Sequence, residues 1–111
     1  MIVERTHLLP GQVVKDRIDS VIDELLHQPP GNVVISRVIR AWDGDTLRFR
    51  FLATKKLFGP LKTTVPIEGT VTVTPTLVRL EAQLAALVSE ESVKRVLERE
   101  FDARIARRAN V

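Results

Sequence analysis

The sequence contains no cysteine, and this absence excludes several kinds of chemistry. Disulfide bonds, zinc sites built on thiolates and cysteine nucleophiles cannot form. A chain without cysteine fits a reducing compartment, so we expect a cytoplasmic protein. The chain has 111 residues, of which 44% are hydrophobic, and this is the usual size and composition of one folded domain. We therefore expect residues 1–111 to form a single domain.

Long apolar runs are also missing, since none approaches the roughly 20 residues that span a bilayer. We expect no transmembrane segment, and the early acid Glu4 and the absence of a long hydrophobic stretch argue against a signal peptide. Charge of one sign is not concentrated, because 17 Lys and Arg are interleaved with 14 Asp and Glu for a net charge of +3. The one local excess, Arg104, Arg107 and Arg108, suits the C-terminal end of a helix, so nucleic-acid binding is disfavoured.

Motifs of the known catalytic and nucleotide-binding classes are absent as well. The only histidines, His7 and His27, each stand at the end of a predicted element without a partner that would make either a general base. Asp43 and Asp45 flank Gly44 but lack the further oxygen ligands that a calcium loop needs. We therefore expect no catalytic residue, no metal ligand and no cofactor, and we do not expect an enzyme.

What the sequence does contain is hydrophobic periodicity. Residues 12–27 repeat apolar side chains every three or four positions, which is typical of an amphipathic helix that ends before Pro29. Residues 33–42 are rich in β-branched side chains but alternate poorly, which indicates burial on both faces or a β-bulge. The other predicted elements are strands at 2–6, 46–51, 67–74 and 78–84, and a helix from an N-cap at Ser89 to about residue 108.

The predicted order of elements is β-α-β-β-β-β-α. Asp43-Gly44 between two strands indicates a tight hairpin turn. We expect the preceding Trp42 at the rim of the core with its N–H bonded, in preference to an exposed binding anchor. The fold class is predicted to be α+β, with a curved antiparallel sheet of four to five strands and both helices on one face. The two edges of such an open sheet are compatible with a homodimer.

The segment 53–64 is predicted to be a long connection that combines apolar and basic side chains. In one interpretation its apolar tip dips into a lipid or polymer surface while the lysines remain in water. In the other, which we favour because large exposed apolar patches are rare on monomers, Phe58 and Leu61 fold back over an open end of the core. The candidate surface-binding residues are Leu57, Phe58, Leu61, Lys55, Lys56 and Lys62.

A long helix lying across a curved antiparallel sheet also resembles the helix-grip arrangement. In that arrangement a cavity for a small apolar ligand opens between the helix and the sheet. With only four or five strands, a solid core is the interpretation that we favour. The side chains that would line such a cavity are Phe49, Phe51, Val71, Leu80 and Phe101.

Several motifs follow one another along residues 7–105. They are His7, Lys15-Asp16-Arg17-Ile18, Trp42-Asp43-Gly44-Asp45 with Leu47 and Phe49, Gly69-Thr70-Val71-Thr72-Val73, Val78-Arg79-Leu80-Glu81 with Leu84 and Leu87, and a charged C-terminal helix. In this order and spacing the chain resembles the bacterial family of polyhydroxyalkanoic acid system proteins, also called polyhydroxyalkanoate granule region proteins. The stretch 52–68 is longer than that family leads us to expect.

The resemblance implies a part in polyhydroxyalkanoate storage, with association with the granule surface, and it implies no catalytic residues. We therefore expect a non-enzymatic accessory protein that binds a granule surface or a partner protein. The alternative that we keep is a carrier of a small apolar ligand, held between the C-terminal helix and the sheet.

Overall fold

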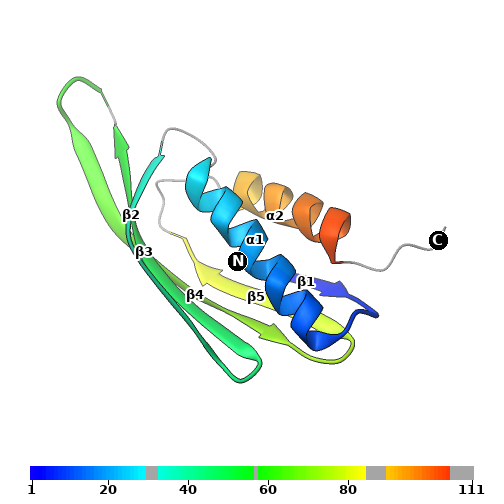
Figure 1. The fold of residues 1–111 in the computed structure, drawn as a ribbon. Helices are drawn as coiled ribbons and strands as arrows, with labels where there is room; N and C mark the ends of the chain where they lie inside the picture. The colour runs from blue at the N-terminus through cyan, green and yellow to red at the C-terminus, as the bar shows by residue number, and fades with distance from the viewer. Residues whose placement is uncertain (30–32, 57, 85–89, 106–111) are drawn as a thin grey trace.

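The computed structural model describes residues 1–29, 33–56, 58–84 and 90–105. Within these residues the elements follow the order β-α-β-β-β-β-α, which confirms the predicted order (Figure 1). The elements are β1 (Ile2–Thr6), α1 (Gly11–His27), β2 (Val33–Asp43), β3 (Thr46–Lys56), β4 (Lys62–Val73), β5 (Leu77–Gln83) and α2 (Glu90–Arg104). The predicted N-cap Ser89, Leu87 and the predicted helix end near residue 108 lie outside the described residues.

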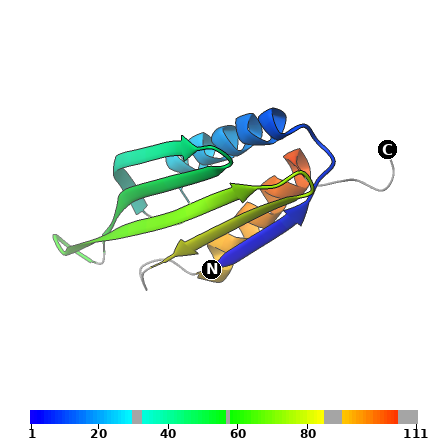
Figure 2. The same ribbon diagram turned by 90° about the horizontal axis from the view of Figure 1, so that it is seen from below.

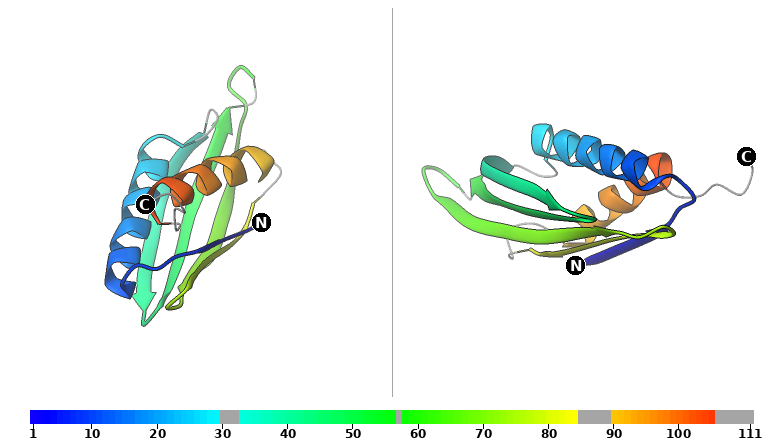
Figure 3. Two further views of the ribbon diagram at one scale, coloured as in Figure 1. Left: turned by 90° about the vertical axis from the view of Figure 1, so that its right-hand side faces the viewer. Right: turned by 60° about the horizontal axis from the view of Figure 1, so that its bottom comes forward.

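The strands form one antiparallel sheet in the order β1-β5-β4-β3-β2, so β1 and β2 are its edges. The sheet curves around α1 and α2, and both helices lie on the same face of it (Figure 3). Figure 2 shows the sheet from the face that neither helix covers. The α+β class with a curved antiparallel sheet is therefore confirmed. Among the described residues, no helix has both the length and the apolar composition of a membrane span.

A β-bulge in β2 explains why residues 33–42 alternate poorly. The register with β3 shifts between Ser36 and Ile39, and Arg37 between them has a φ of 52°. The one extra residue of β2 changes which side chains face the helices, so that Ile35 before the bulge and Arg40 after it both line the same cavity. The sequence leaves two explanations open, burial of the strand on both faces or a β-bulge, and the structure has the bulge.

The β3–β4 hairpin is longer than predicted, because residues 53–64 are mostly paired strand and not a connection. Ala53 pairs with Val65, and the pairing continues to Lys56 opposite Lys62. Pro66 is tolerated inside β4 because β5 pairs only with the part of β4 from Glu68 onward. At Pro66 β4 has β3 on one side and no described strand on the other, and a missing N–H costs no ladder hydrogen bond there.

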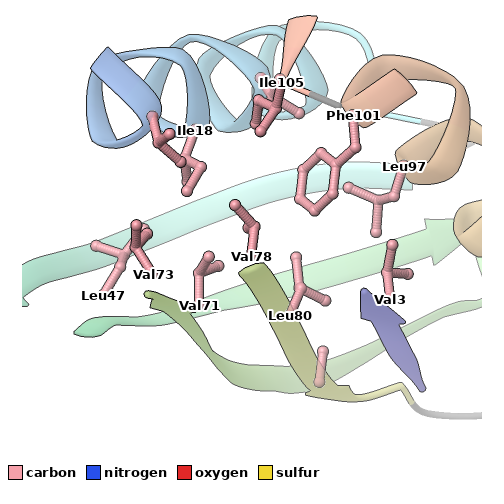
Figure 4. Packing of buried hydrophobic residues seen from close by; sticks show 13 residues of the cluster. Val3, Ile18, Leu47, Val71, Val73, Val78, Leu80, Leu97, Phe101 and Ile105 are labelled. Atoms are coloured by element: carbon pink, nitrogen blue, oxygen red, sulfur yellow. The ribbon is translucent and has the colours of Figure 1, made fainter. Parts of the chain in front are cut away.

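The core lies between the sheet and the two helices (Figure 4). Ile18 of α1 and Phe101 of α2 are each 1% exposed and meet the apolar side of the strands. Full burial of side chains of this kind contributes about 1.5–3 kcal/mol each. The buried cluster consists of Val3, Val14, Ile18, Val21, Leu47, Val71, Val73, Val78, Leu80, Ala82, Leu97, Phe101 and Ile105.

Polar contacts fix α1 to the β2–β3 hairpin. Lys15 Nζ donates to the carbonyl oxygen of Gly44 at 2.9 Å, lies 2.8 Å from Asp45 Oδ1 and sits 5.5 Å above the ring of Trp42. One turn along the helix, Asp19 accepts the indole N–H of Trp42 at 3.2 Å. Trp42 therefore packs at the rim of the core with its N–H bonded, which confirms the prediction for this residue.

Candidate functional site

The tip of the β3–β4 hairpin presents two apolar side chains to solvent. The hairpin projects beyond both helices (Figure 1), and Phe58 is 74% exposed while Leu61 is 51% exposed. Gly59, with a φ of 58°, allows the turn in which the N–H of Leu61 bonds the carbonyl oxygen of Phe58 at 3.1 Å. The favoured expectation that Phe58 and Leu61 fold back over the core is therefore wrong, because the extended hairpin carries them away from it. Leu57 lies outside the described residues.

Lysines occupy the same end of the hairpin. Lys56 is directly opposite Lys62 in the register, and Lys55 is opposite Thr63. Like charges directly opposite each other in a sheet are destabilising. The structure thus brings together the exposed pair Phe58 and Leu61 with the cations of β3 and β4, as the sequence analysis grouped them.

A second candidate site is an apolar cavity of about 110 Å³ between the helices and the sheet. Of the five side chains proposed to line it, Phe49, Phe51 and Leu80 do so. Val71 and Phe101 do not, because they belong to the closely packed core and are 0% and 1% exposed. The expectation of a solid core thus holds for one part of the interior only.

The shape of the cavity depends on a glycine. The rings of Phe49 and Phe51 are stacked with their centroids 6.2 Å apart, and Gly69 lies directly opposite Phe49 in β4. A Cβ atom on Gly69 would overlap the backbone oxygen of Glu81 and approach Phe49 Cζ to 2.5 Å. Gly69 therefore leaves the space in which the Phe49 ring lies against the sheet.

Arg40 is the one charged side chain among the described residues that line this cavity. Its Nη2 donates to Asp23 Oδ1 of α1 at 2.5 Å. Its Nη1 is buried and has no hydrogen-bond partner. A buried donor without an acceptor is unfavourable, but Nη1 is not accessible from the cavity, whose surface is almost entirely apolar. The position of Arg40 at the cavity could not be predicted from the sequence, because only the position of the bulge decides which face it occupies.

The open face of the sheet is mostly polar, with the exposed side chains of Ile2 and Ile39 on its edge strands, and several of its charges pair with each other. Arg50 Nε lies 3.7 Å from Glu68 Oε1 across β3 and β4. On β5, Arg79 Nε donates to Glu81 at 2.6 Å, and Arg79 Nη1 lies 3.5 Å from Glu4 of β1. Exposed pairs of this kind contribute at most about 1 kcal/mol each. A shallow depression of about 620 Å³ on this face is lined by both signs of charge, which is typical of a solvated surface.

The histidines of the sequence have ordinary structural positions. His7 is 1% exposed, its Nδ1 accepts the N–H of Leu9 at 3.1 Å, and its Nε2 lies 2.8 Å from the carbonyl oxygen of Thr74. Because Nδ1 itself accepts a hydrogen bond and Nε2 faces a carbonyl oxygen, these contacts require the neutral tautomer with its proton on Nε2. His7 thus joins the end of β1 to the β4–β5 turn, and His27 is exposed at the last residue of α1.

The remaining polar candidates are also accounted for. Asp45 pairs with Lys15, and no group of three or more metal-ligating side chains occurs in the part of the chain that the structure describes. Arg104 is bonded to Glu24 of α1 at 2.5 Å and to Glu100 at 3.2 Å, and these contacts, with that to Glu24 foremost, raise its pKa. The predicted residues Arg107 and Arg108 lie outside the described residues.

Comparisons with models of protein families, with curated proteins and with solved structures find no match to this chain. The resemblance to the polyhydroxyalkanoate granule region proteins therefore stays a prediction that rests on the order of its motifs.

Proposed function

We propose that this protein is a non-enzymatic accessory protein that attaches to an apolar surface through the tip of the β3–β4 hairpin. The observation that carries the proposal is the 74% exposure of Phe58 at the end of a projecting hairpin, next to the opposed Lys56 and Lys62. An opposed lysine pair weakens the hairpin, so local stability does not account for this cluster. With the family resemblance, the proposed surface is that of a polyhydroxyalkanoate granule in the bacterial cytoplasm.

The size of the tip sets the strength of the attachment. Burial of one Phe and one Leu side chain contributes at most about 3–6 kcal/mol together, before the cost of immobilising the protein is subtracted. The lysine heads can remain in water at the rim of the contact while their alkyl chains lie along it. One tip alone therefore provides weak and reversible binding, which suits an accessory protein that exchanges between the surface and solution.

Sedimentation with bare amorphous polyhydroxyalkanoate particles tests the proposal. We expect the wild-type protein to sediment with the particles and Phe58→Asp to stay in solution, because an aspartate at the tip would have to lose its hydration. Leu8→Asp is the matched control. Leu8 is 69% exposed in the segment between β1 and α1, at the opposite end of the molecule (Figure 1), and we expect this variant to bind like the wild type.

Circular dichroism must show that both variants remain folded. If the wild-type protein ignores the particles, or if Phe58→Asp binds as well as Leu8→Asp, the tip is not the attachment site and the proposal is wrong. Binding that is lost equally in both variants would mean that general exposed apolar area drives sedimentation, which also contradicts a specific tip.

A carrier of a small apolar ligand is the second candidate function, and the cavity of about 110 Å³ is the observation that favours it. Small-molecule sites are concave and mostly apolar, with a few polar groups that orient the ligand. Here Phe49, Phe51 and Leu80 provide apolar wall, and the cavity presents almost no polar surface, which suits an apolar ligand. The two candidate functions use separate parts of the molecule and do not exclude each other.

A further inference from the structure

The cavity between the helices and the sheet has a closed side and an open side. On the closed side the sheet contributes Ala53, Ile67 and Leu80, which are all buried. On the open side Val38 of β2 lines the cavity and is nevertheless 42% exposed. A residue with both properties lies where the cavity meets water. A ligand can therefore place one end in the cavity and keep the other end in solvent beside Val38.

The polarity of the cavity decides which end of a ligand enters. Its surface is almost entirely apolar, and Phe49, Phe51 and Leu25 are among the residues that line it. Arg40 does not alter this, because its Nη1 is not accessible from the cavity and its Nη2 pairs with the exposed Asp23. A hydroxyl or a charged group inside the cavity would lose its hydration without gaining a hydrogen bond, whereas each methylene that leaves water is favourable. The enclosed end of the ligand is therefore hydrocarbon.

The volume limits how much of the ligand enters. A cavity of about 150 Å³ can hold benzene, which has six carbon atoms, so this cavity of about 110 Å³ holds roughly four or five. We propose that the cavity binds the apolar end of an amphiphile, an alkyl chain of which about four or five carbon atoms are enclosed while the polar head group remains in water beside Val38. This inference rests on the second candidate function and adds the class of ligand to it.

The primary alcohols from 1-propanol to 1-heptanol are suitable probes, because they share one hydroxyl and differ only in the length of the chain. Amide chemical shifts in ¹H–¹⁵N spectra of the whole protein, recorded as each alcohol is added, give the dissociation constants. We expect each added methylene to tighten binding about four-fold as far as about 1-pentanol, which is the effect of burying one methylene. Beyond that length the added methylenes lie outside the cavity, so each step should change the dissociation constant less than about two-fold.

A diol tests which end of the chain is enclosed. 1,5-Pentanediol has the chain of 1-pentanol with a hydroxyl at both ends, so one hydroxyl has to enter the apolar cavity. We expect it to bind at least about ten-fold more weakly than 1-pentanol, because the buried hydroxyl loses its hydration.

Two variants place the alkyl chain in the cavity. Ala53→Val adds two methyl groups on the closed side, so the space for the chain shortens by about two carbon atoms. We expect 1-pentanol to bind this variant about ten-fold more weakly and 1-propanol to bind it almost unchanged. Ala41→Val is the matched control, because Ala41 is exposed on β2 and does not line the cavity, and it should bind both alcohols like the wild type. Urea denaturation shows that both variants are folded.

The outcomes separate the carrier function from the inference about its ligand. If no alcohol shifts the amides of residues that line the cavity, the carrier function itself is wrong. If the alcohols bind there but the affinity rises by the same factor through 1-heptanol, or if 1,5-pentanediol binds as tightly as 1-pentanol, the carrier function stands and the inference is wrong. Equal binding of 1-pentanol to Ala53→Val and Ala41→Val also contradicts the inference. Should Ala53→Val fail to fold, the chain-length series and the diol decide in the wild type.

Discussion

Gly69 illustrates how one residue controls the interior of this molecule. It lies between Phe49 of β3 and Ala82 of β5, and its missing side chain leaves room for a ring and for the backbone of β5. In most strands a glycine weakens the sheet, because it adds conformational entropy to the unfolded chain and packs no side chain. Here glycine is required for steric reasons, since a Cβ atom would overlap the backbone oxygen of Glu81, which can move only together with β5.

We expect Gly69→Ala to lower the free energy of unfolding by about 1–3 kcal/mol, because the added methyl group overpacks the site against the Glu81 backbone oxygen. Urea denaturation measures the change. Gly11→Ala is the matched control, because a Cβ at Gly11 has no atom within 4 Å and Gly11 begins α1. That control should be neutral or slightly stabilising. Equal stability of the two variants would show that β4 and β5 can separate without cost.

At the scale of whole elements, the bulge in β2 determines which face Arg40 occupies. The sequence predicts the element and the irregularity, since the alternation fails visibly between residues 33 and 42. It does not predict the position of the irregularity, because Arg37 takes a left-handed conformation that arginine rarely adopts. The bulge also places an irregular backbone on an edge strand, where it hinders pairing with another sheet.

Arg37→Gly tests this strained position. The left-handed conformation costs a residue with a side chain about 1–2 kcal/mol, and glycine avoids this cost but adds about 0.5–1 kcal/mol of unfolded-state entropy. We expect a net gain in the free energy of unfolding of about 0.5 kcal/mol. Arg48→Gly, at an exposed position of β3 without a positive φ, should lower stability. Chemical denaturation of both variants is the measurement, and a loss of stability in Arg37→Gly would mean that the bulge carries no strain.

Local patterns explain most of the elements that the sequence predicts. The periodicity of apolar residues and the hairpin signal at Asp43-Gly44 depend on neighbours in the chain. The helix and the hairpin are confirmed, but the two turn residues are Gly44 and Asp45, since Asp43 pairs with Thr46, and of these two only Gly44 has a positive φ. The sequence does not predict the length of the β3–β4 hairpin, because Pro66 interrupts a ladder only where its nitrogen faces a paired strand, and which side is paired is a property of the sheet. The cavity was not favoured for a similar reason, because a void depends on how side chains from four or more elements meet.

At the scale of the whole molecule, one side chain of the first strand forms two ion pairs with the last helix, in addition to the apolar packing between them. Arg5 of β1 donates from Nε to Asp102 at 2.6 Å and from Nη2 to Glu98 at 2.9 Å, both on α2. These hydrogen bonds, with that to Asp102 foremost, raise the pKa of Arg5. A raised pKa extends the pH range in which the guanidinium is charged, so the stabilising contact is fully present at ordinary pH and is lost only as the pH rises through the raised value.

We expect Arg5→Gln to lower the free energy of unfolding by about 1 kcal/mol and to speed hydrogen exchange of amides along α2, because charge-assisted bonds between distant segments are lost. Arg95→Gln removes the exposed Arg95–Glu91 pair within α2 and is the control. Its effect should stay below about 0.5 kcal/mol. If exchange in α2 is the same in both variants, the helix is held by its apolar side alone.

The cavity also affects how the protein responds to pressure. Unfolding eliminates internal void, and because this cavity is partly open to solvent, the value of about 66 mL per mole that corresponds to its full volume of about 110 Å³ is an upper limit to the change. The closely packed part around Val71 and Phe101 has no comparable space to lose. Pressure should therefore perturb the structure around Phe49 and Phe51 before the closely packed part. A molecule bound in the cavity should reduce this difference in compressibility between the two parts of the interior.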